Sequence, residues 1–251
     1  MKTIAIINQK GGVAKTTTTI NLGAYLAALG KKTLIVDLDP QGNATSGLGI
    51  NRFDLSKCIY DGLINDEPVE NIIHKTQVDN LDLIPATIQL AGAEIEMVAV
   101  ISREYQLKNL LKTINNYDYL LIDCPPSLGL LTLNALTAAD SYIVPIQCEY
   151  YALEGLGQLL KTVDLVKKGL NPELEMCGAL MTMYNANTNL SAQVVAEVKA
   201  YFKEKAFESI IPRSIRLSEA PSHGEPISIY DKQSKGALAY EALAKEVIQR
   251  D

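Results

Sequence analysis

The segment from Lys10 to Thr17 reads Lys-Gly-Gly-Val-Ala-Lys-Thr-Thr and contains the residue types that bind a nucleotide phosphate. Gly11 and Gly12 leave the backbone free to turn its N–H groups toward an anion, and a helix that begins there adds its favourable N-terminal dipole. Lys15 is placed to reach the β- and γ-phosphates, while the Thr16 hydroxyl can ligate Mg²⁺. The segment is therefore a candidate phosphate loop.

The spacing departs at two positions from the common phosphate-loop pattern G-x-x-x-x-G-K-[ST]. Gln9 stands at the first glycine, and Ala14 stands at the glycine before Lys15. The Ala14 methyl group disfavours left-handed backbone angles, whereas a negative φ would accommodate it. A glycine-rich turn with solvated lysines is the alternative, but the strand before the segment and the helix after it favour a phosphate loop.

Two further expected strands end in acids, at Asp37 and at Asp123, and Asp39 follows the first of them. A carboxylate at the end of a buried strand is costly unless it is paired or close to a metal. Asp123 therefore fits the role of holding Mg²⁺ through a water ligand. Asp37 and Asp39 can face the same side while strand geometry persists. Alternatively, Asp39 and the Pro-Gln-Gly that follows it could form a simple turn.

The elements that must position these residues alternate between short β-branched runs and longer helical stretches, as in repeated βα units. We expect strands at 3–8, 33–37, 81–85, 119–123, 141–146 and 176–183, and helices at 15–29, 152–168, 191–205 and 236–250. Residues 42–78 are expected to be an irregular insertion beside the site. The predicted fold is α/β, with a single doubly wound, mostly parallel sheet flanked by helices in one domain over 1–251. The ligand of such a sheet binds at the C-terminal ends of its strands.

The amino-acid composition limits the classes of protein to which this chain can belong. Of the 251 residues, 47% are hydrophobic and 21% are charged, which suits a chain that buries a core. Apolar runs fall short of the roughly 18–20 residues that span a bilayer, and the start lacks signal-peptide features, so a cytoplasmic chain is expected. The net charge of -6 does not attract DNA or anionic lipid by itself, so such binding needs a local basic patch. The four cysteines are widely spaced and are expected to be ordinary thiols.

The loop resembles the deviant Walker A motif of the ParA/MinD ATPases, which usually reads K-G-G-V-G-K-T-T. The blocks at 39–49, 123–127 and 211–224 look like the Soj/ParA branch, which segregates chromosomes or plasmids. The resemblance implies ATP and Mg²⁺ as cofactors, bound by Lys10, Gly11, Gly12, Val13, Ala14, Lys15, Thr16 and Thr17. It also implies slow hydrolysis of ATP to ADP and phosphate. An ATP-dependent homodimer would bind non-specific double-stranded DNA of the nucleoid, and a ParB/Spo0J-like partner would stimulate hydrolysis and release.

The same resemblance assigns roles to individual residues. Lys10 would cross the dimer interface to the phosphates of the partner's nucleotide, much as an arginine finger does. Asp39 would position the attacking water, and Asp37 would assist at the metal or the water. The adenine would lie near Met183, Asn185, Pro212 and Arg213.

DNA binding in this family needs only a cationic surface for phosphate contacts. The best candidates are Arg213 and Arg216, and weaker ones, each of which could equally be a solvated lysine, are Lys199, Lys203, Lys205, Lys232 and Lys235. Relatives commonly carry an arginine in place of Asn187, so its absence implies weaker DNA affinity or reliance on the other cations. Since the sequence starts at its first expected strand, a helix-turn-helix extension that reads specific sites is not expected.

Three other functions share this loop. A MinD-like, membrane-associated cell-division regulator needs a C-terminal amphipathic helix with a basic polar face. Residues 237–250 carry only Lys245 and Arg250 as cations, so we expect a packing helix and no membrane binding. An iron–sulfur ATPase reductase needs cluster cysteines at its dimer axis, but Cys124 and Cys148 lie in other blocks. A metabolic ligase or kinase would need an acceptor site, which the sequence does not reveal.

Overall fold

The computed structural model describes residues 1–150, 152–153 and 155–251. The strands found in these residues form one eight-stranded sheet in the order β3-β4-β2-β5-β1-β6-β7-β8. Their bounds are β1 Lys2–Ile6, β2 Thr33–Asp37, β3 His74–Lys75, β4 Leu81–Ile84, β5 Tyr119–Asp123, β6 Ser141–Gln147, β7 Glu175–Tyr184 and β8 Ala206–Pro212. Neighbouring strands are parallel except for β3, which pairs antiparallel with β4. The predicted mostly parallel α/β sheet is confirmed.

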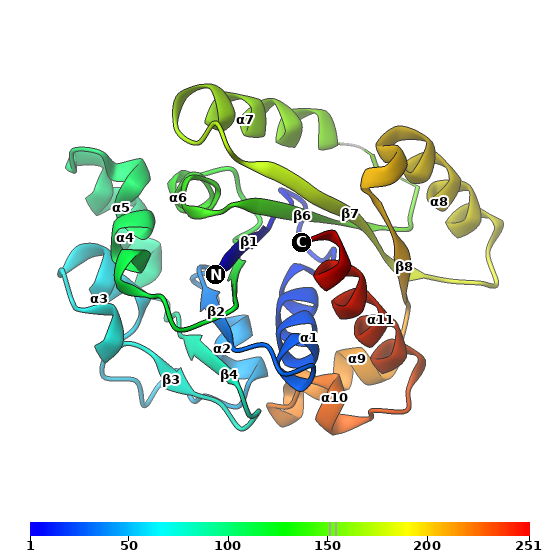
Figure 1. Ribbon diagram of the computed structural model, residues 1–251, viewed down its shortest axis with the longest axis horizontal. Coiled ribbons are helices and arrows are strands. Elements are labelled where there is room, and N and C mark those ends of the chain that lie inside the picture. The colour runs from blue at the N-terminus through cyan, green and yellow to red at the C-terminus, as the bar shows by residue number, and fades with distance from the viewer. Residues whose placement is uncertain (151, 154) are drawn as a thin grey trace.

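Helices cover both faces of this sheet, as the parallel strands require. Their bounds are α1 Lys15–Ala28, α2 Asn43–Gly47, α3 Ile59–Ile64, α4 Leu90–Glu96, α5 Gln106–Leu110, α6 Leu130–Ala138, α7 Leu156–Gly169, α8 Asn189–Phe202, α9 Ile215–Glu219, α10 Ile227–Tyr230 and α11 Lys235–Arg250, with six short 3₁₀ segments among the described residues. Figure 1 shows α1 and α11 side by side on one face, with α6 and α7 on the other. Of the helices described, none is long and apolar enough to cross a membrane.

Alternate residues of β1 point into two separate hydrophobic cores. Ile4 and Ile6 belong to the core under α1 and α11, whereas Ala5 and Ile7, the residue directly after β1, belong to the core under α6 and α7. This alternation follows from the two-residue period of a strand. It explains why the strand is apolar from Ile4 onward.

The structure differs from the sequence-based expectations at β8, which was not predicted. Two polar residues, Glu208 and Ser209, interrupt its apolar run. They are tolerated there because β8 is an edge strand that pairs only with β7 and is partly exposed. Their backbone N–H groups donate instead to the Glu246 carboxylate of α11, at 2.9 Å each. Covering an edge in this way protects its unpaired backbone groups.

Two other ranges also differ. The stretch 42–78 was expected to be irregular, but it contains α2, α3 and the short strand β3. The helix expected over 152–168 begins at Leu156 in the structure, and Glu154 within that range lies outside the described residues. The assignment of the whole chain to one domain stays a prediction.

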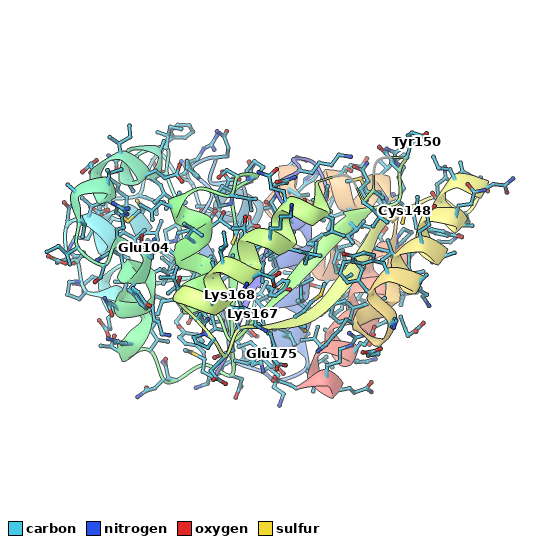
Figure 2. The ribbon with its side chains drawn as sticks, turned by 90° about the horizontal axis from the view of Figure 1, so that it is seen from above. Glu104, Cys148, Tyr150, Lys167, Lys168 and Glu175 are labelled. Carbon is cyan, nitrogen blue, oxygen red and sulfur yellow. The ribbon has the colours of Figure 1, made fainter. Side chains whose placement is uncertain are left out.

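Parallel pairing brings the C-terminal ends of β1, β2 and β5 to one edge of the sheet. Asp123 is in register with Ile6 of β1 and with Asp37 of β2. Figure 2 shows the two opposite edges from above: Cys148 and Tyr150 follow β6 at one end, whereas Glu175 begins β7 at the other. The expected phosphate loop and acids therefore meet at a single edge, as the rule for open α/β sheets requires.

Candidate nucleotide site

The loop between β1 and α1 is anchored to neighbouring strands. The Asn8 side chain accepts a hydrogen bond from the Lys10 N–H at 3.0 Å and donates one to the Pro145 carbonyl of β6 at 2.8 Å. On the other side of the loop, the Thr182 hydroxyl of β7 donates to the buried Val13 carbonyl at 3.1 Å. These contacts fix the loop before any ligand arrives, so a phosphate would meet backbone N–H groups already in place.

The loop backbone is left-handed at two positions, Gly12 with φ +74° and Ala14 with φ +68° and ψ +32°. Gly11 and Gly12 are exposed, and α1 begins directly afterwards at Lys15. The negative φ that would accommodate Ala14 is therefore not adopted. An L-residue held in this region is strained by about 1–2 kcal/mol, so Ala14 occupies a place that favours glycine.

Lys15 is buried beneath the loop. Its side chain is 6% exposed, and its ammonium donates to the Lys10 carbonyl at 3.1 Å. Burial lowers its pKa, while the carboxylates of Asp123 and Asp39 act in the opposite direction. A buried ammonium held inside a loop of N–H groups is suited to neutralise a phosphate. Lys10 itself is half-buried and lines an open hollow of about 600 Å³ together with Ser127.

Asp37 and Asp123 lie side by side and are completely buried. Asp37 accepts hydrogen bonds from the Thr45 backbone N–H at 2.8 Å and the Thr45 hydroxyl at 2.7 Å through one oxygen, and from the Asp39 N–H at 3.2 Å through the other. Burial raises the pKa of Asp37 to about 6 despite these bonds. Burial and the neighbouring Asp37 charge raise the pKa of Asp123 to about 8.

The environment of Asp123 fits a magnesium ion. One of its oxygens accepts from the Thr19 hydroxyl at 3.2 Å, and the Thr16 side chain acts to lower the pKa of this carboxylate. Its Oδ2 is buried and has no hydrogen-bond partner among the residues that the structure describes. A buried, half-satisfied carboxylate is costly unless a cation compensates it. Thr16 and Asp123 would hold Mg²⁺, the latter through water.

A magnesium site of this kind does not need a full set of protein ligands. The described part of the chain contains no group of three or more His, Cys, Asp or Glu residues suited to hold a metal ion. Mg²⁺ commonly keeps several waters and takes further ligands from the phosphates of its substrate. One hydroxyl and one carboxylate are therefore a sufficient protein contribution.

Asp39 is buried at the same edge, within a turn. Its carboxylate accepts the Gln41 N–H at 2.9 Å, and its carbonyl accepts the Gly42 N–H at 2.9 Å. The turn considered as an alternative is therefore present. Asp39 nevertheless acts electrostatically on both Lys15 and Asp123, so the turn brings this carboxylate to the phosphate loop.

A pocket of about 320 Å³ continues from the phosphate loop and suits a base and its sugar. It is lined by Ala14, Thr17, Met183, Ile211, Pro212, Arg213, Ser214, Leu217, Ser218, Pro221 and Tyr240. Three of the predicted adenine contacts, Met183, Pro212 and Arg213, are among these residues. Asn185 is not: its side-chain oxygen accepts the Asn187 N–H at 3.1 Å in the loop after β7.

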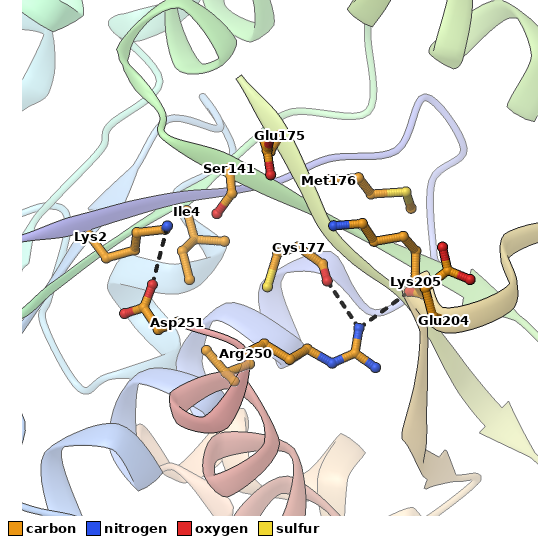
Figure 3. A pocket seen from close by; sticks show the side chains of 11 residues that line it. Lys2, Ile4, Ser141, Glu175, Met176, Cys177, Glu204, Lys205, Arg250 and Asp251 are labelled. Atoms are coloured by element: carbon orange, nitrogen blue, oxygen red, sulfur yellow. Dashed lines mark hydrogen bonds and ion pairs between the residues drawn. The ribbon is translucent and has the colours of Figure 1, made fainter. Parts of the chain in front are cut away.

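A second pocket, of about 260 Å³, lies at the opposite edge of the sheet (Figure 3). Lys2 is paired there with Asp251 at 3.2 Å, and Arg250 donates to the Cys177 carbonyl at 3.0 Å. This pocket is bounded by the N-terminal ends of β1, β6 and β7, away from the phosphate loop. The phosphate loop borders the first pocket through Ala14 and Thr17, so that pocket is the candidate nucleotide site.

The structure does not bring all the predicted DNA-binding cations together. Arg213 lines the nucleotide pocket, whereas Lys205 lines the pocket at the opposite edge. Arg216 is paired with Glu219 at 3.1 Å and with Asp231 at 3.5 Å. Further pairs join Arg213 to Glu149 at 3.5 Å and Lys199 to Glu208 at 2.5 Å. The exposed candidates also include Lys203, Lys232 and Lys235.

Sequence reasoning missed several residues that shape the site. Asn8 anchors the loop, Thr45 binds Asp37, and Leu217 and Tyr240 line the pocket. Thr45 lies within the block 39–49 that resembles the Soj/ParA branch, so that block could have pointed to it. Tyr240 comes from the last helix and carried no local signal.

Comparison with known proteins agrees with this geometry. A family model described as an AAA domain matches residues 1–176. The sporulation initiation inhibitor protein Soj of Bacillus subtilis is 64% identical over 247 residues, which cover 98% of each chain. The chromosome partitioning protein ParA of Myxococcus xanthus is 56% identical, with 99% of this chain and 88% of that protein covered.

Solved structures share the fold. Cobyrinic acid a,c-diamide synthase from Mycobacterium smegmatis, with bound ADP and magnesium, has a TM-score of 0.88 at 40% identity and covers 99% of this chain and 94% of its own. The septum site-determining protein MinD of Pyrococcus horikoshii, complexed with Mg-ADP, has a TM-score of 0.80 at 27% identity. The match covers 98% of this chain and 95% of that protein's chain. Because the similarity to Soj and ParA extends over nearly the full length at high identity, the chain belongs to the Soj/ParA family of chromosome-partitioning ATPases.

Proposed function

We propose that this chain is an ATP-driven switch for the segregation of chromosomal or plasmid DNA. ATP and Mg²⁺ bind at the end of β1 and drive formation of a homodimer that binds double-stranded DNA without sequence specificity. Slow hydrolysis, stimulated by a ParB/Spo0J-like partner, releases the protein from the nucleoid. The observation that carries the proposal is the buried cradle in which Lys15, the left-handed loop and the half-satisfied Asp123 converge.

The residues divide the chemistry among them. Mg²⁺, when bound, neutralises charge on the β- and γ-phosphates. Lys15 holds the same phosphates from beneath the loop, and Lys10 of each subunit reaches the nucleotide of the other. Asp39 orients the attacking water, and Asp37 holds the Asp39 backbone at 3.2 Å. Positioning by a carboxylate alone, with no stronger base, gives the slow turnover that suits a timed switch.

DNA binding would come from cations on the nucleotide edge. Arg213 and Leu217 both line the nucleotide pocket, so Arg216 lies beside it on α9. Lys235 begins α11, which supplies Tyr240 to the same pocket. A dimer that joins two such edges doubles the local positive charge, which compensates for the net charge of -6. This would make DNA binding depend on ATP.

The membrane-associated alternative is less well supported by α11. The apolar side of this helix, which includes Tyr240, Leu243 and Val247, is buried against the core. A helix that binds a lipid surface must expose its apolar face. Liposome flotation with ATP tests the alternative, because lipid binding without DNA binding would favour a MinD-like role.

The nucleotide switch is tested by two variants and DNA retardation. Lys15→Ala should abolish binding of radiolabelled ATP, because the phosphate loses its buried counter-charge. Asp39→Ala should retain ATP binding but hydrolyse too slowly to leave the dimeric, DNA-bound state. Retardation of a DNA fragment is expected with ATP and not with ADP or without nucleotide. Normal turnover in Asp39→Ala, or retardation that ignores the nucleotide, would refute the proposal.

A further inference from the structure

Thr45 is the buried partner of Asp37 and belongs to α2, which follows the Asp39 turn. It is completely buried, and α2 lies beside β2 and α1 (Figure 1). Its backbone N–H donates to Asp37 Oδ2 at 2.8 Å, and its hydroxyl donates to the same oxygen at 2.7 Å. Two donors of a single residue therefore hold one oxygen of this carboxylate.

A third hydrogen bond fixes the direction of the Thr45 hydroxyl. The backbone N–H of Ala86, in the chain after β4, donates to the hydroxyl oxygen at 2.9 Å. Because a peptide N–H only donates, the hydroxyl oxygen is the acceptor in that bond, and its single proton is left for Asp37. A side chain that merely filled the same space would not supply this proton.

The other oxygen of Asp37 reaches the turn that carries Asp39. Asp37 Oδ1 accepts the Asp39 N–H at 3.2 Å, and the Asp39 carboxylate accepts the Gln41 N–H at 2.9 Å. A chain of hydrogen bonds thus runs from the Thr45 hydroxyl through Asp37 to Asp39. Since the two oxygens of a carboxylate are held in one plane, rotation of the Asp37 side chain would disturb both ends of this chain.

The Asp39 turn also contacts the chain after β4. Gly42, the last residue of the turn, has φ +62°, and a β-carbon there would lie 2.8 Å from the Ala86 carbonyl oxygen. Ala86 is also the residue whose N–H holds Thr45. The turn and the Thr45 hydroxyl are therefore held against the same stretch of backbone.

A buried threonine with a merely structural role looks different. Thr137 in α6 is also completely buried, and its hydroxyl donates at the same distance of 2.7 Å. Its acceptor is the Leu133 carbonyl of its own helix, whereas the acceptor of Thr45 is a carboxylate at the nucleotide edge. A hydrogen bond to a charged acceptor is roughly twice as strong as a neutral one. The Thr45 bond therefore controls the orientation of a charged group of the site.

We infer that Thr45 is a positioning residue for ATP hydrolysis, because its hydroxyl holds Asp37 in the orientation that directs Asp39 toward the attacking water. The inference rests on the proposed role of Asp39 and adds the residue that sets its orientation. In the reaction, the water oxygen bonds to the γ-phosphorus while the bond to the β–γ bridging oxygen breaks, which yields ADP, phosphate and one released proton. Thr45 lies buried beneath the acids, so it acts through them and not on the nucleotide itself.

Hydrolysis of Mg²⁺–ATP by Thr45→Val and Thr45→Ser tests the inference. Valine closely matches the shape of threonine without its hydroxyl, whereas serine keeps the hydroxyl. Thr45→Val should lower kcat roughly tenfold or more, because Asp39 loses its fixed orientation. Its Kd for a non-hydrolysable ATP analogue should stay within roughly twofold of the unmodified protein, since Lys15 and the phosphate loop are unchanged. Thr45→Ser should recover most of the lost kcat.

A second background and a matched control separate positioning from general damage. Thr45→Val added to Asp39→Ala should slow single-turnover hydrolysis by less than roughly twofold, because both changes remove the same function. Thr137→Val removes a comparable buried hydroxyl and should leave kcat and analogue affinity unchanged. Circular dichroism and urea unfolding at the assay temperature establish that each variant is folded. Thr45→Ala takes the place of Thr45→Val if valine prevents folding.

Several outcomes would overturn the inference. Unchanged kcat in the folded variant without the hydroxyl, or failure of Thr45→Ser to recover activity, would show that the hydroxyl does not position the acids. Analogue affinity that falls together with kcat would indicate general disruption of the site. Slow hydrolysis by Asp39→Ala beside normal hydrolysis by Thr45→Val would refute the inference alone. Normal hydrolysis by Asp39→Ala would instead refute the proposed role of Asp39, and the inference with it.

Discussion

Replacing Ala14 with glycine should stabilise the nucleotide-free protein. Ala14 holds φ +68° and ψ +32° in the phosphate loop, a conformation that costs an L-residue about 1–2 kcal/mol. Glycine removes that strain, but its more flexible unfolded chain offsets about 0.5–1 kcal/mol. At the middle of both ranges, the net gain in the free energy of unfolding is therefore about 0.7 kcal/mol. For a chain of this size, such a gain raises Tm by about 1–4 °C.

Calorimetry and urea unfolding of the nucleotide-free protein measure this difference. Ala239→Gly is the matched control, because Ala239 lies inside α11 with helical backbone. The same change there should lower the free energy of unfolding by about 1 kcal/mol, since glycine is a poor helix former. The two identical substitutions should thus have opposite signs. If Ala14→Gly is as destabilising as Ala239→Gly, Ala14 is not strained in solution and the description of the loop is wrong.

Two other predictions concern the buried acids. Thr45→Val should lower the free energy of unfolding by about 2 kcal/mol or more, because Asp37 loses a 2.7 Å hydrogen bond and the Ala86 N–H loses its acceptor; Thr45→Ser, which keeps the hydroxyl, should lose less in the same urea titration. Stability without magnesium should fall as pH rises from about 4 to about 8. The raised pKa values of Asp37, about 6, and Asp123, about 8, mean that the folded state binds more protons than the unfolded state in this range. Asp123→Asn should flatten the decrease between pH 6 and 8, and an unchanged slope would show that Asp123 is already ionised at pH 6.

Local sequence was sufficient to predict the strands that are buried on both faces of the sheet. The apolar runs of β2 and β5 end in Asp37 and Asp123, and the predicted bounds 33–37 and 119–123 agree with the structure. The rule that ligands bind at the C-terminal ends of parallel strands then placed both acids beside the phosphate loop. Met183, Pro212 and Arg213, which the family resemblance predicts to lie near the adenine, line one pocket beside the phosphate loop, and adenine binding there stays a prediction.

The remaining features depend on contacts that no local pattern encodes. The positive φ of Ala14 is set by how the loop closes onto β6 and β7, and propensity alone favours the opposite sign. Tyr240 reaches the pocket because α11 folds back against α1, more than two hundred residues away in sequence. The edge strand β8 escaped prediction because two polar residues, Glu208 and Ser209, interrupt its apolar run. Their backbone N–H groups are bound by the Glu246 carboxylate of α11, a contact that no local pattern indicates.

The central claim is that the cradle around Lys15 takes up Mg²⁺–ATP and thereby joins two subunits. Sedimentation velocity of the Asp39→Ala protein, saturated in turn with Mg²⁺–ATP and Mg²⁺–ADP, tests it most directly. The account predicts a dimer with ATP and a monomer with ADP, and a monomer in both for the variant that also carries Lys15→Ala. A protein that stays monomeric at saturating Mg²⁺–ATP, or dimerises equally with both nucleotides, would contradict it.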